Sequence, residues 1–521
     1  MNFSFKDQKL KEYFFIIIIF LVSISVNQYY GNIGVYPIDS FLFFDSGFRF
    51  LNGQFPFKDV WTFSGPLIDL IQGIFFKLFG ISWFTYVLHA SFFNFLISIS
   101  TYFVLRKFQL EPHFCLFYSL TLALVAYTNS GTPSLDHHSM IFSIIAIFIF
   151  ILAIKENNNI YWFLIPIFLF FAFLSKQTPA GYIIILISTI SFLYFLFNFS
   201  YKRIIIVVSS SILCLATLLL FFYLNKIPIS SFYDQYILFA SSIGKERFSY
   251  YLYPIEFSRY ILRFKIIHLS QLILIIIVLK NIYKDFNYLK SNEFFILVSL
   301  IATGLIFIFH QILSLNQKFI FMIIPILIGF SHIFYKKYFI NKKIISFFLI
   351  LLALGSSIYN ISAYANNRKF MDLENIDLKK AISAKELDRR LEGLKWISPI
   401  YPSNPKLEVS LLKDIIKIMK EDKQKKMLIT HYQFISAIID ESTLSPSKTY
   451  TTNGISYPTS ESKFFNQYKI FFNNLIKKNK VKSIYIIKPL KDEIITDFID
   501  KSCYSKNDIN EILTIYKINE C

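Results

Sequence analysis

The segment 36–80 concentrates ionisable side chains in a chain that is otherwise strongly apolar. A charge beside a lipid bilayer is costly to keep dry, so ionisable groups in such a place usually have a function. Six charged residues lie among the aromatic residues of this segment: Asp39, Asp45, Arg49, Lys58, Asp59 and Asp69. The segment is therefore the first candidate for a catalytic or binding site.

A short helix along the membrane surface is predicted for 41–51, because its apolar residues recur at helical spacing. Asp45 and Arg49 lie four residues apart beside that apolar face. They form either an ion pair that supports the helix or a carboxylate that Arg49 orients for use as a general base. Asp59 either caps a turn or is a second catalytic carboxylate. The residue pattern alone leaves both alternatives open.

The run Asp136-His137-His138 is a second group of polar residues with ligand chemistry. It suits either a metal or acceptor contact or the packing of a polar loop. One Asp and two adjacent His cannot easily face a single ion on regular structure, which favours packing. The sequence assigns no certain cofactor and leaves a divalent cation as one interpretation of this run.

Composition predicts that these groups are carried by a multi-span membrane protein. The 521 residues are 55% hydrophobic with a mean hydropathy of +0.50, more apolar surface than a soluble chain can bury. The net charge of +19 would suit nucleic acid. However, the basic residues lie in short loops between apolar stretches, as the positive-inside rule describes, so we expect no nucleic-acid partner.

Eleven apolar stretches are long enough to span a bilayer or nearly so. They are 14–27, 82–105, 113–128, 138–154, 159–174, 180–198, 204–224, 264–279, 293–312, 319–334 and 344–362. The basic connectors all fall on one side if the N-terminus is cytoplasmic, which places the C-terminus outside. The expected location is a bacterial inner membrane, with the first loop, 28–81, on the outer face.

The composition changes after the last predicted span. We expect 1–362 to form the membrane domain and 363–521 a small extracytoplasmic α/β domain. Strands are predicted at 427–430 and 483–487, and helices at 411–419 and 464–477. Cys503 and Cys521 both lie in this domain, and an oxidising compartment would favour a bridge between them.

The first loop contains an acidic residue, a predicted short helix, the pattern L-x-G-x-x-P-[YF]-x-D and a later G-P. The residues of this pattern are Asp45, Leu51, Gly53, Pro56, Phe57, Asp59, Gly65, Pro66 and Leu67. The loop thereby resembles that of GT-C integral-membrane glycosyltransferases, in the family that includes protein mannosyltransferases and the aminoarabinose transferase, where the pattern ends in G-P or K-P-P-L. Two later segments also match. Ser175–Thr178 is similar to the family's K-Q-[TP] motif at the outer end of a middle span, and 310–325 is similar to its late R/K-F-x-x-x-x-x-P segment. Many relatives carry a Lys immediately before two consecutive prolines, where this chain has Ser64-Gly65 before Pro66.

The resemblance implies transfer of a sugar from a polyprenyl-phosphate carrier to an unknown glycan, lipid or protein acceptor, with inversion by single displacement. Asp45 would be the catalytic base, with Asp59 as a second acidic group. Cations must face the phosphate leaving group. The residues implied for that contact are Lys176, Gln177, Arg247, Arg259 and Lys318.

Two other functions fit a membrane protein of this kind. A transporter or flippase of lipid-linked glycans should show repeated halves and charges near mid-span, whereas here the charges gather on one predicted face. A polymerase or ligase of such glycans would instead rely on a large late outer loop rich in Arg and His. The acidic first loop favours the transferase.

Overall fold

The computed structural model describes residues 5–251, 256–314, 319–339, 343–451, 454–490 and 493–519. The chain divides into two compact units. We call the first the membrane unit; it comprises Met1–Gly31, Ala90–Leu219 and Glu246–Phe370. We call the second the mixed unit; it comprises Asn32–His89, Leu220–Lys245 and Met371–Cys521.

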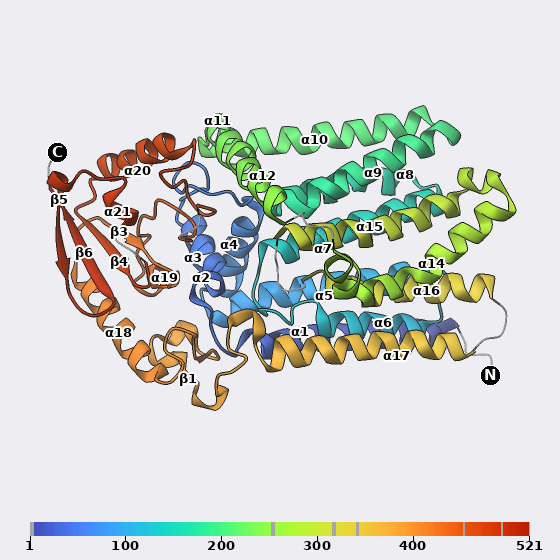
Figure 1. The fold of residues 1–521 in the computed structure, drawn as a ribbon, viewed down its shortest axis with the longest axis horizontal. Helices are drawn as coiled ribbons and strands as arrows, with labels where there is room; N and C mark the ends of the chain where they lie inside the picture. The colour runs from blue at the N-terminus through green and yellow to red at the C-terminus, as the bar shows by residue number, and fades with distance from the viewer. Residues whose placement is uncertain are drawn as a thin grey trace. The chain divides into compact units, whose positions relative to one another are not determined.

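Long apolar helices that pack side by side form the membrane unit (Figure 1). They are α1 (Phe5–Gly31), α5 (Trp83–Lys107), α6 (Pro112–Val125), α7 (Leu135–Glu156), α8 (Asn159–Ser175), α9 (Gln177–Phe197), α10 (Tyr201–Asn225), α14 (Lys265–Lys284), α15 (Asn292–Ser314), α16 (Ile323–Tyr338) and α17 (Lys343–Asn360). Each predicted span coincides with one of them. In the described part of the chain, nine helices are long and apolar enough to cross a membrane, while α6 and α8 are shorter. The protein is a multi-pass membrane protein with a small C-terminal sheet.

Helix α7 is the most enclosed helix of the membrane unit. Its apolar window is 94% buried, against 11% for α10 and 22% for α1. It packs against α8, α9 and α15. Polar residues in its first turn therefore face protein instead of lipid, and a charge there can be held by side chains of neighbouring helices.

The basic connectors of the membrane unit form ion pairs with acidic residues at the ends of neighbouring helices. These pairs are Arg106–Glu12 (3.1 Å), Lys107–Glu156 (3.0 Å), Lys336–Glu111 (2.6 Å) and Lys337–Glu293. Glu156 is the last residue of α7. The polar residues at the start of α7 therefore lie at the other end of that helix. Which of these helix ends face the cytoplasm stays a prediction.

A four-stranded sheet in the order β3-β4-β6-β5 forms the centre of the C-terminal region (Figure 1). β3 (Lys426–Ile429) and β4 (Ser483–Ile487) are parallel, and the other neighbours are antiparallel. The later strands are β5 (Tyr504–Asp508) and β6 (Leu513–Ile518), and the main helices are α18 (Pro405–Glu421) and α20 (Phe465–Asn479). The predicted strands and helices of this region are confirmed.

Several short elements complete the described chain. They are α2 (Pro37–Ser40), α3 (Leu42–Leu51), α4 (Leu67–Phe79), α11 (Ile229–Phe232), α12 (Ala240–Tyr251), α13 (Phe257–Tyr260), α19 (Ile435–Ile438), α21 (Glu493–Thr496), β1 (Ile382–Ser383) and β2 (Lys395–Trp396). Helices α2, α3 and α4 belong to the first loop and carry most of its charged residues.

The first loop packs into the core of the C-terminal region. Trp61 of this loop and Phe239 join the cluster of buried residues that covers the sheet. The structure therefore groups 32–89 with 371–521, whereas the sequence suggested a boundary at 362 alone. The division into a membrane domain and an extracytoplasmic domain stays a prediction.

Helix α3 packs its apolar face on protein, and its predicted position along the membrane surface stays a prediction. Phe41 and Phe44 are fully buried. The Phe41 ring lies 4.7 Å from that of Phe434 and 5.6 Å from that of Trp396. The apolar stripe was predicted correctly, but C-terminal aromatic residues cover it in place of lipid.

Candidate functional site

Asp45 is a buried carboxylate in α3, and in the described part of the chain only one of its two oxygens is hydrogen-bonded. Its exposed fraction is 7%. Oδ2 accepts a hydrogen bond from Nε of Arg49, one helical turn away. Oδ1 is buried and has no hydrogen-bond partner among the described residues. An unpaired buried carboxylate oxygen is costly, and an incoming O–H donor would satisfy it.

Arg49 is held on several sides, so it can fix the orientation of Asp45. Its Nη1 donates to the carbonyl of Thr443 and, at 3.1 Å, to Oε1 of Gln54. Its Nη2 donates to the hydroxyls of Thr443 (3.3 Å) and Ser436 (3.4 Å). Three of these four acceptors belong to the C-terminal region, far along the sequence from the first loop.

A second buried ion pair lies beside the first. Nζ of Lys448 contacts Oδ1 of Asp69 at 2.5 Å and lies 4.5 Å from the centre of the Phe43 ring. Ser46 donates to the same carboxylate oxygen at 2.7 Å. Burial lowers the pKa of the Lys448 ammonium, while Asp69 and Asp45 act in the opposite direction.

Backbone pairing fixes Lys448 to the first loop. The N–H of Trp61 donates to the carbonyl of Pro446 at 3.0 Å, and the N–H of Lys448 donates to the carbonyl of Trp61 at 3.1 Å. Gln235 holds the same loop through its amide, which accepts from the N–H of Thr62 (3.0 Å) and donates to the carbonyl of Phe57 (3.1 Å). Hydrogen bonds thus hold the first loop both to the segment 446–448 and to Gln235.

One small cavity is lined by both ion pairs. Eleven residues surround it, among them Asp45, Arg49, Asp69 and Lys448. The cavity is lined by the Asp45 carboxylate, whose Oδ1 has no partner among the described residues, by the two cations that hold the carboxylates, and by the hydrogen-bonded first loop. A carboxylate held in this way can accept a proton from an acceptor hydroxyl.

Asp59 caps a turn instead of facing this cavity. Its Oδ2 accepts from the N–H of Phe55 at 3.0 Å, and its own N–H donates to the carbonyl of Phe55 at 2.9 Å. It is absent from the residues that line the cavity described above. The geometry supports the structural alternative for Asp59.

We expect Asp59→Asn to leave activity close to that of the wild type, because the amide oxygen can still accept from Phe55. Asp59→Ala removes the acceptor and should lower stability by about 1 kcal/mol, as is typical when a side-chain cap is lost. Turnover and thermal unfolding of both variants check this. A loss of turnover in Asp59→Asn as large as in Asp45→Asn would show that Asp59 takes part in the chemistry.

The membrane unit brings Asp136, Lys176 and His310 together from three different helix ends. Nζ of Lys176 contacts both carboxylate oxygens of Asp136, at 2.7 and 2.8 Å. Nε2 of His310 lies 3.1 Å from Oδ1. Arg247, also predicted to face the phosphate, lies in α12 and is half-buried. Two groups that can carry positive charge, Lys176 and His310, thus contact one carboxylate, an arrangement suited to an anionic ligand.

The structure gives the two histidines of the Asp136-His137-His138 run packing roles. The His137 ring stacks on Tyr127 at 4.3 Å. Nδ1 of His138 lies 2.9 Å from the carbonyl of Ser134, and its ring packs on Phe93. Within the described residues, no three His, Cys, Asp or Glu side chains are grouped to hold a metal. With Asp136 already engaged by Lys176 and His310, this run does not fit a divalent ion.

The remaining predicted site residues lie in different parts of the chain. Gln177 begins α9, next to Lys176, and is half-buried, as is Arg259 in α13. Lys318 lies outside the described residues. Cys503 is disulfide-bonded, and its predicted partner Cys521 lies outside the described residues, so that pairing stays a prediction.

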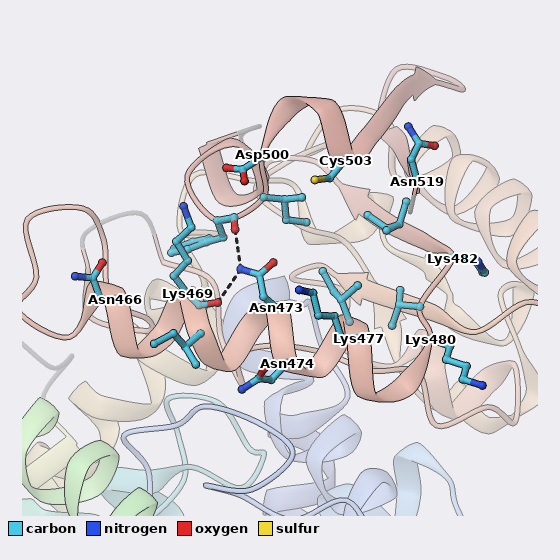
Figure 2. Close-up of a pocket in the computed structure, with 16 residues that line it drawn as sticks. Asn466, Lys469, Asn473, Asn474, Lys477, Lys480, Lys482, Asp500, Cys503 and Asn519 are labelled. Carbon is cyan, nitrogen blue, oxygen red and sulfur yellow. Dashed lines mark hydrogen bonds between the residues drawn. The ribbon is translucent and has the colours of Figure 1, made fainter. Parts of the chain in front are cut away.

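A larger hollow lies on the C-terminal region, between α20 and the segment 498–503 (Figure 2). Figure 2 shows Asn473 joining these two walls; its side chain donates to the carbonyls of Lys469 (2.9 Å) and Phe498 (3.0 Å). Of the predicted site residues, only Cys503 lines the hollow. Its remaining polar lining consists of asparagines, lysines and one aspartate at the protein surface.

Sequence reasoning missed Lys448 and the role of His310. Lys448 is 379 residues from Asp69 along the chain, and the Ser-Pro-Ser-Lys segment that carries it shows no motif. His310 was noted only as the start of a segment similar to the family. A lone His near the end of an apolar span was the available signal, since an ionisable residue there indicates function.

Comparisons with known proteins give matches only among solved structures. No family model and no curated protein matches the sequence. The chain is similar to the Archaeoglobus fulgidus oligosaccharyltransferase in complex with Zn and sulfate, with 12% identity over 94% of this chain and 71% of that chain and a TM-score of 0.44. It is also similar to ArnT from Cupriavidus metallidurans bound to undecaprenyl phosphate, with 11% identity over 96% and 97% of the two chains and a TM-score of 0.45.

Proposed function

We propose that this protein is a membrane glycosyltransferase that moves a sugar from a polyprenyl-phosphate carrier to an acceptor hydroxyl, with Asp45 as the general base. The observation that carries the proposal is that Asp45 lines a cavity, that Arg49 holds its carboxylate in place, and that its Oδ1 has no hydrogen-bond partner among the described residues. A base must be oriented and must have an open lone pair for the proton it accepts. The polyprenyl-phosphate donor is implied by the resemblance of the first loop.

We assign the donor phosphate to the group around Lys176. A phosphate is the leaving group of such a transfer, and positive charge facing it lowers the barrier as negative charge develops. Lys176 and His310 supply that charge, with Arg247 as a further cation implied by the resemblance, whereas Asp136 keeps the cluster neutralised when no anion is bound. Outer-face transfer at a bacterial inner membrane, with the N-terminus cytoplasmic, is part of the same proposal.

Surface glycans of a deletion strain compared with those of its parent by mass spectrometry test the proposal. We expect one sugar modification to be lost in the deletion strain, restored by the wild-type gene and not by the gene carrying Asp45→Asn. Restoration by both genes would contradict the role of Asp45. Build-up of the lipid-linked sugar on the cytoplasmic leaflet of the deletion strain would instead support a flippase.

A further inference from the structure

We propose that the Lys448 ammonium, together with the Arg49 guanidinium, is the built-in positive charge of the Asp45–Asp69 cavity, so that this cavity works without a divalent metal ion. The inference rests on the proposed function in that it concerns the cofactor requirement of the same site. It is nevertheless testable by metal binding, without any transfer assay.

The cavity has two of the features that a divalent-ion site needs. Asp45 and Asp69 both line it, and both are almost fully buried, with exposed fractions of 7% and 2%. One oxygen of Asp45 has no hydrogen-bond partner among the described residues. Carboxylate oxygens of this kind are the preferred ligands of Mg²⁺, Mn²⁺ and Ca²⁺. Arg49 already neutralises Asp45, so Asp69 is the carboxylate of the cavity that needs a further cation.

Lys448 already supplies the compensating charge. Its Nζ lies 2.5 Å from Oδ1 of Asp69, and Asp45 interacts electrostatically with it. The position is enforced by the backbone pairing with Trp61 and by the Phe43 ring beneath the ammonium. A divalent ion at Asp69 would have to displace this ammonium or lie against it, and like-charge repulsion at that range opposes binding.

The chain offers a matched control in the same unit. Lys426 is also buried, with a side-chain exposure of 1%, and its Nζ lies 2.5 Å from Glu441. It neutralises a single, partly exposed carboxylate and does not line the cavity. Removing its ammonium therefore tests the effect of losing a buried lysine without uncovering a carboxylate of the cavity.

The experiment measures Mn²⁺ binding to the full-length protein in detergent, by electron paramagnetic resonance and by the shift in melting temperature. We expect wild type and Lys426→Met to show no binding that depends on Asp45. Lys448→Met keeps the side-chain volume but removes the charge, and should gain a saturable Mn²⁺ site that raises its melting temperature. Adding Asp45→Asn to Lys448→Met should abolish that gain.

Two metal-binding results would overturn the inference. One is Mn²⁺ binding by the wild type that is lost in Asp45→Asn or Asp69→Asn. The other is a Lys448→Met protein that responds to Mn²⁺ no more than Lys426→Met does. Should Lys448→Met fail to fold, the wild-type measurement still decides, because a metal-dependent site must bind Mn²⁺ when Lys448 is present. Donor turnover that survives a chelator in the wild type would support the inference, and turnover that needs Mn²⁺ would refute it.

Discussion

Asp45→Asn is expected to lower turnover by about 10²–10⁴-fold, the usual loss when a positioned general base is removed. Asparagine has nearly the shape of aspartate, and its amide oxygen can still accept from Nε of Arg49. It cannot take up the proton of an acceptor hydroxyl. The measurement is the rate of sugar transfer from an undecaprenyl-phosphate donor by the purified variant.

The buried position of the pair makes a stability control necessary. The sequence suggested an exposed ion pair, but the side chains of Arg49 and Asp45 are only 5% and 9% exposed. Breaking a buried pair costs about 3–5 kcal/mol when one partner is lost outright. Arg49 keeps its contacts with Gln54, Ser436 and Thr443, so we expect a smaller cost here. Lys426→Met, which removes another buried cation from its ion pair with the partly exposed Glu441, is the control for unfolding without loss of the base.

Near-normal turnover in Asp45→Asn would contradict the assignment of the base. If Asp136→Asn abolished turnover at the same time, the chemistry would belong to the start of α7 instead of the first loop. Melting temperatures of both variants separate that outcome from simple unfolding.

The membrane helices could be predicted from the sequence because lipid imposes a simple rule on them. A helix must present roughly twenty apolar residues to cross the bilayer, so the eleven apolar stretches stand out from the loops. The same rule predicted that basic connectors and polar loops would lie at opposite helix ends. It is a local rule, readable without knowledge of any tertiary contact.

The surroundings of Asp45 could not be predicted because they depend on contacts across the whole chain. The periodicity of 41–51 predicted a helix with one apolar face, and α3 has that face. An apolar face suits lipid and protein equally, and only the fold reveals that Trp396 and Phe434 cover it. Lys448 likewise reaches Asp69 only because 446–448 pairs with Trp61.

The arrangement around Lys176 was predicted in part. The sequence marked Asp136 and Lys176 as separate candidates, one for the acceptor or a metal and one for the phosphate. The structure joins them in one ion pair. Residues at the same end of different helices can meet, but hydropathy does not specify which helices are neighbours, so the pairing could not be derived from the spans.

Lys176→Met is expected to weaken binding of undecaprenyl phosphate by about tenfold to a hundredfold, because a hydrogen bond to a charged group contributes about 1.5–3 kcal/mol. The affinity for undecaprenol, which lacks the phosphate, should not change. Lys107→Met is the matched control, since it removes a lysine from an exposed pair with Glu156 at the other end of the bundle. Equilibrium binding of both lipids to each variant in detergent gives the comparison.

Asp136→Asn distinguishes a phosphate site from a purely structural ion pair. Without the carboxylate charge, Lys176 and His310 lose their shared partner, and positive charge is left uncompensated in a buried place. A structural pair predicts lower stability that undecaprenyl phosphate cannot restore. A phosphate site predicts that the lipid binds at least as tightly as to the wild type and raises the melting temperature of Asp136→Asn by more, because the anion replaces the missing carboxylate. Unchanged binding in Lys176→Met together with no rescue of Asp136→Asn would remove Lys176 from the donor site.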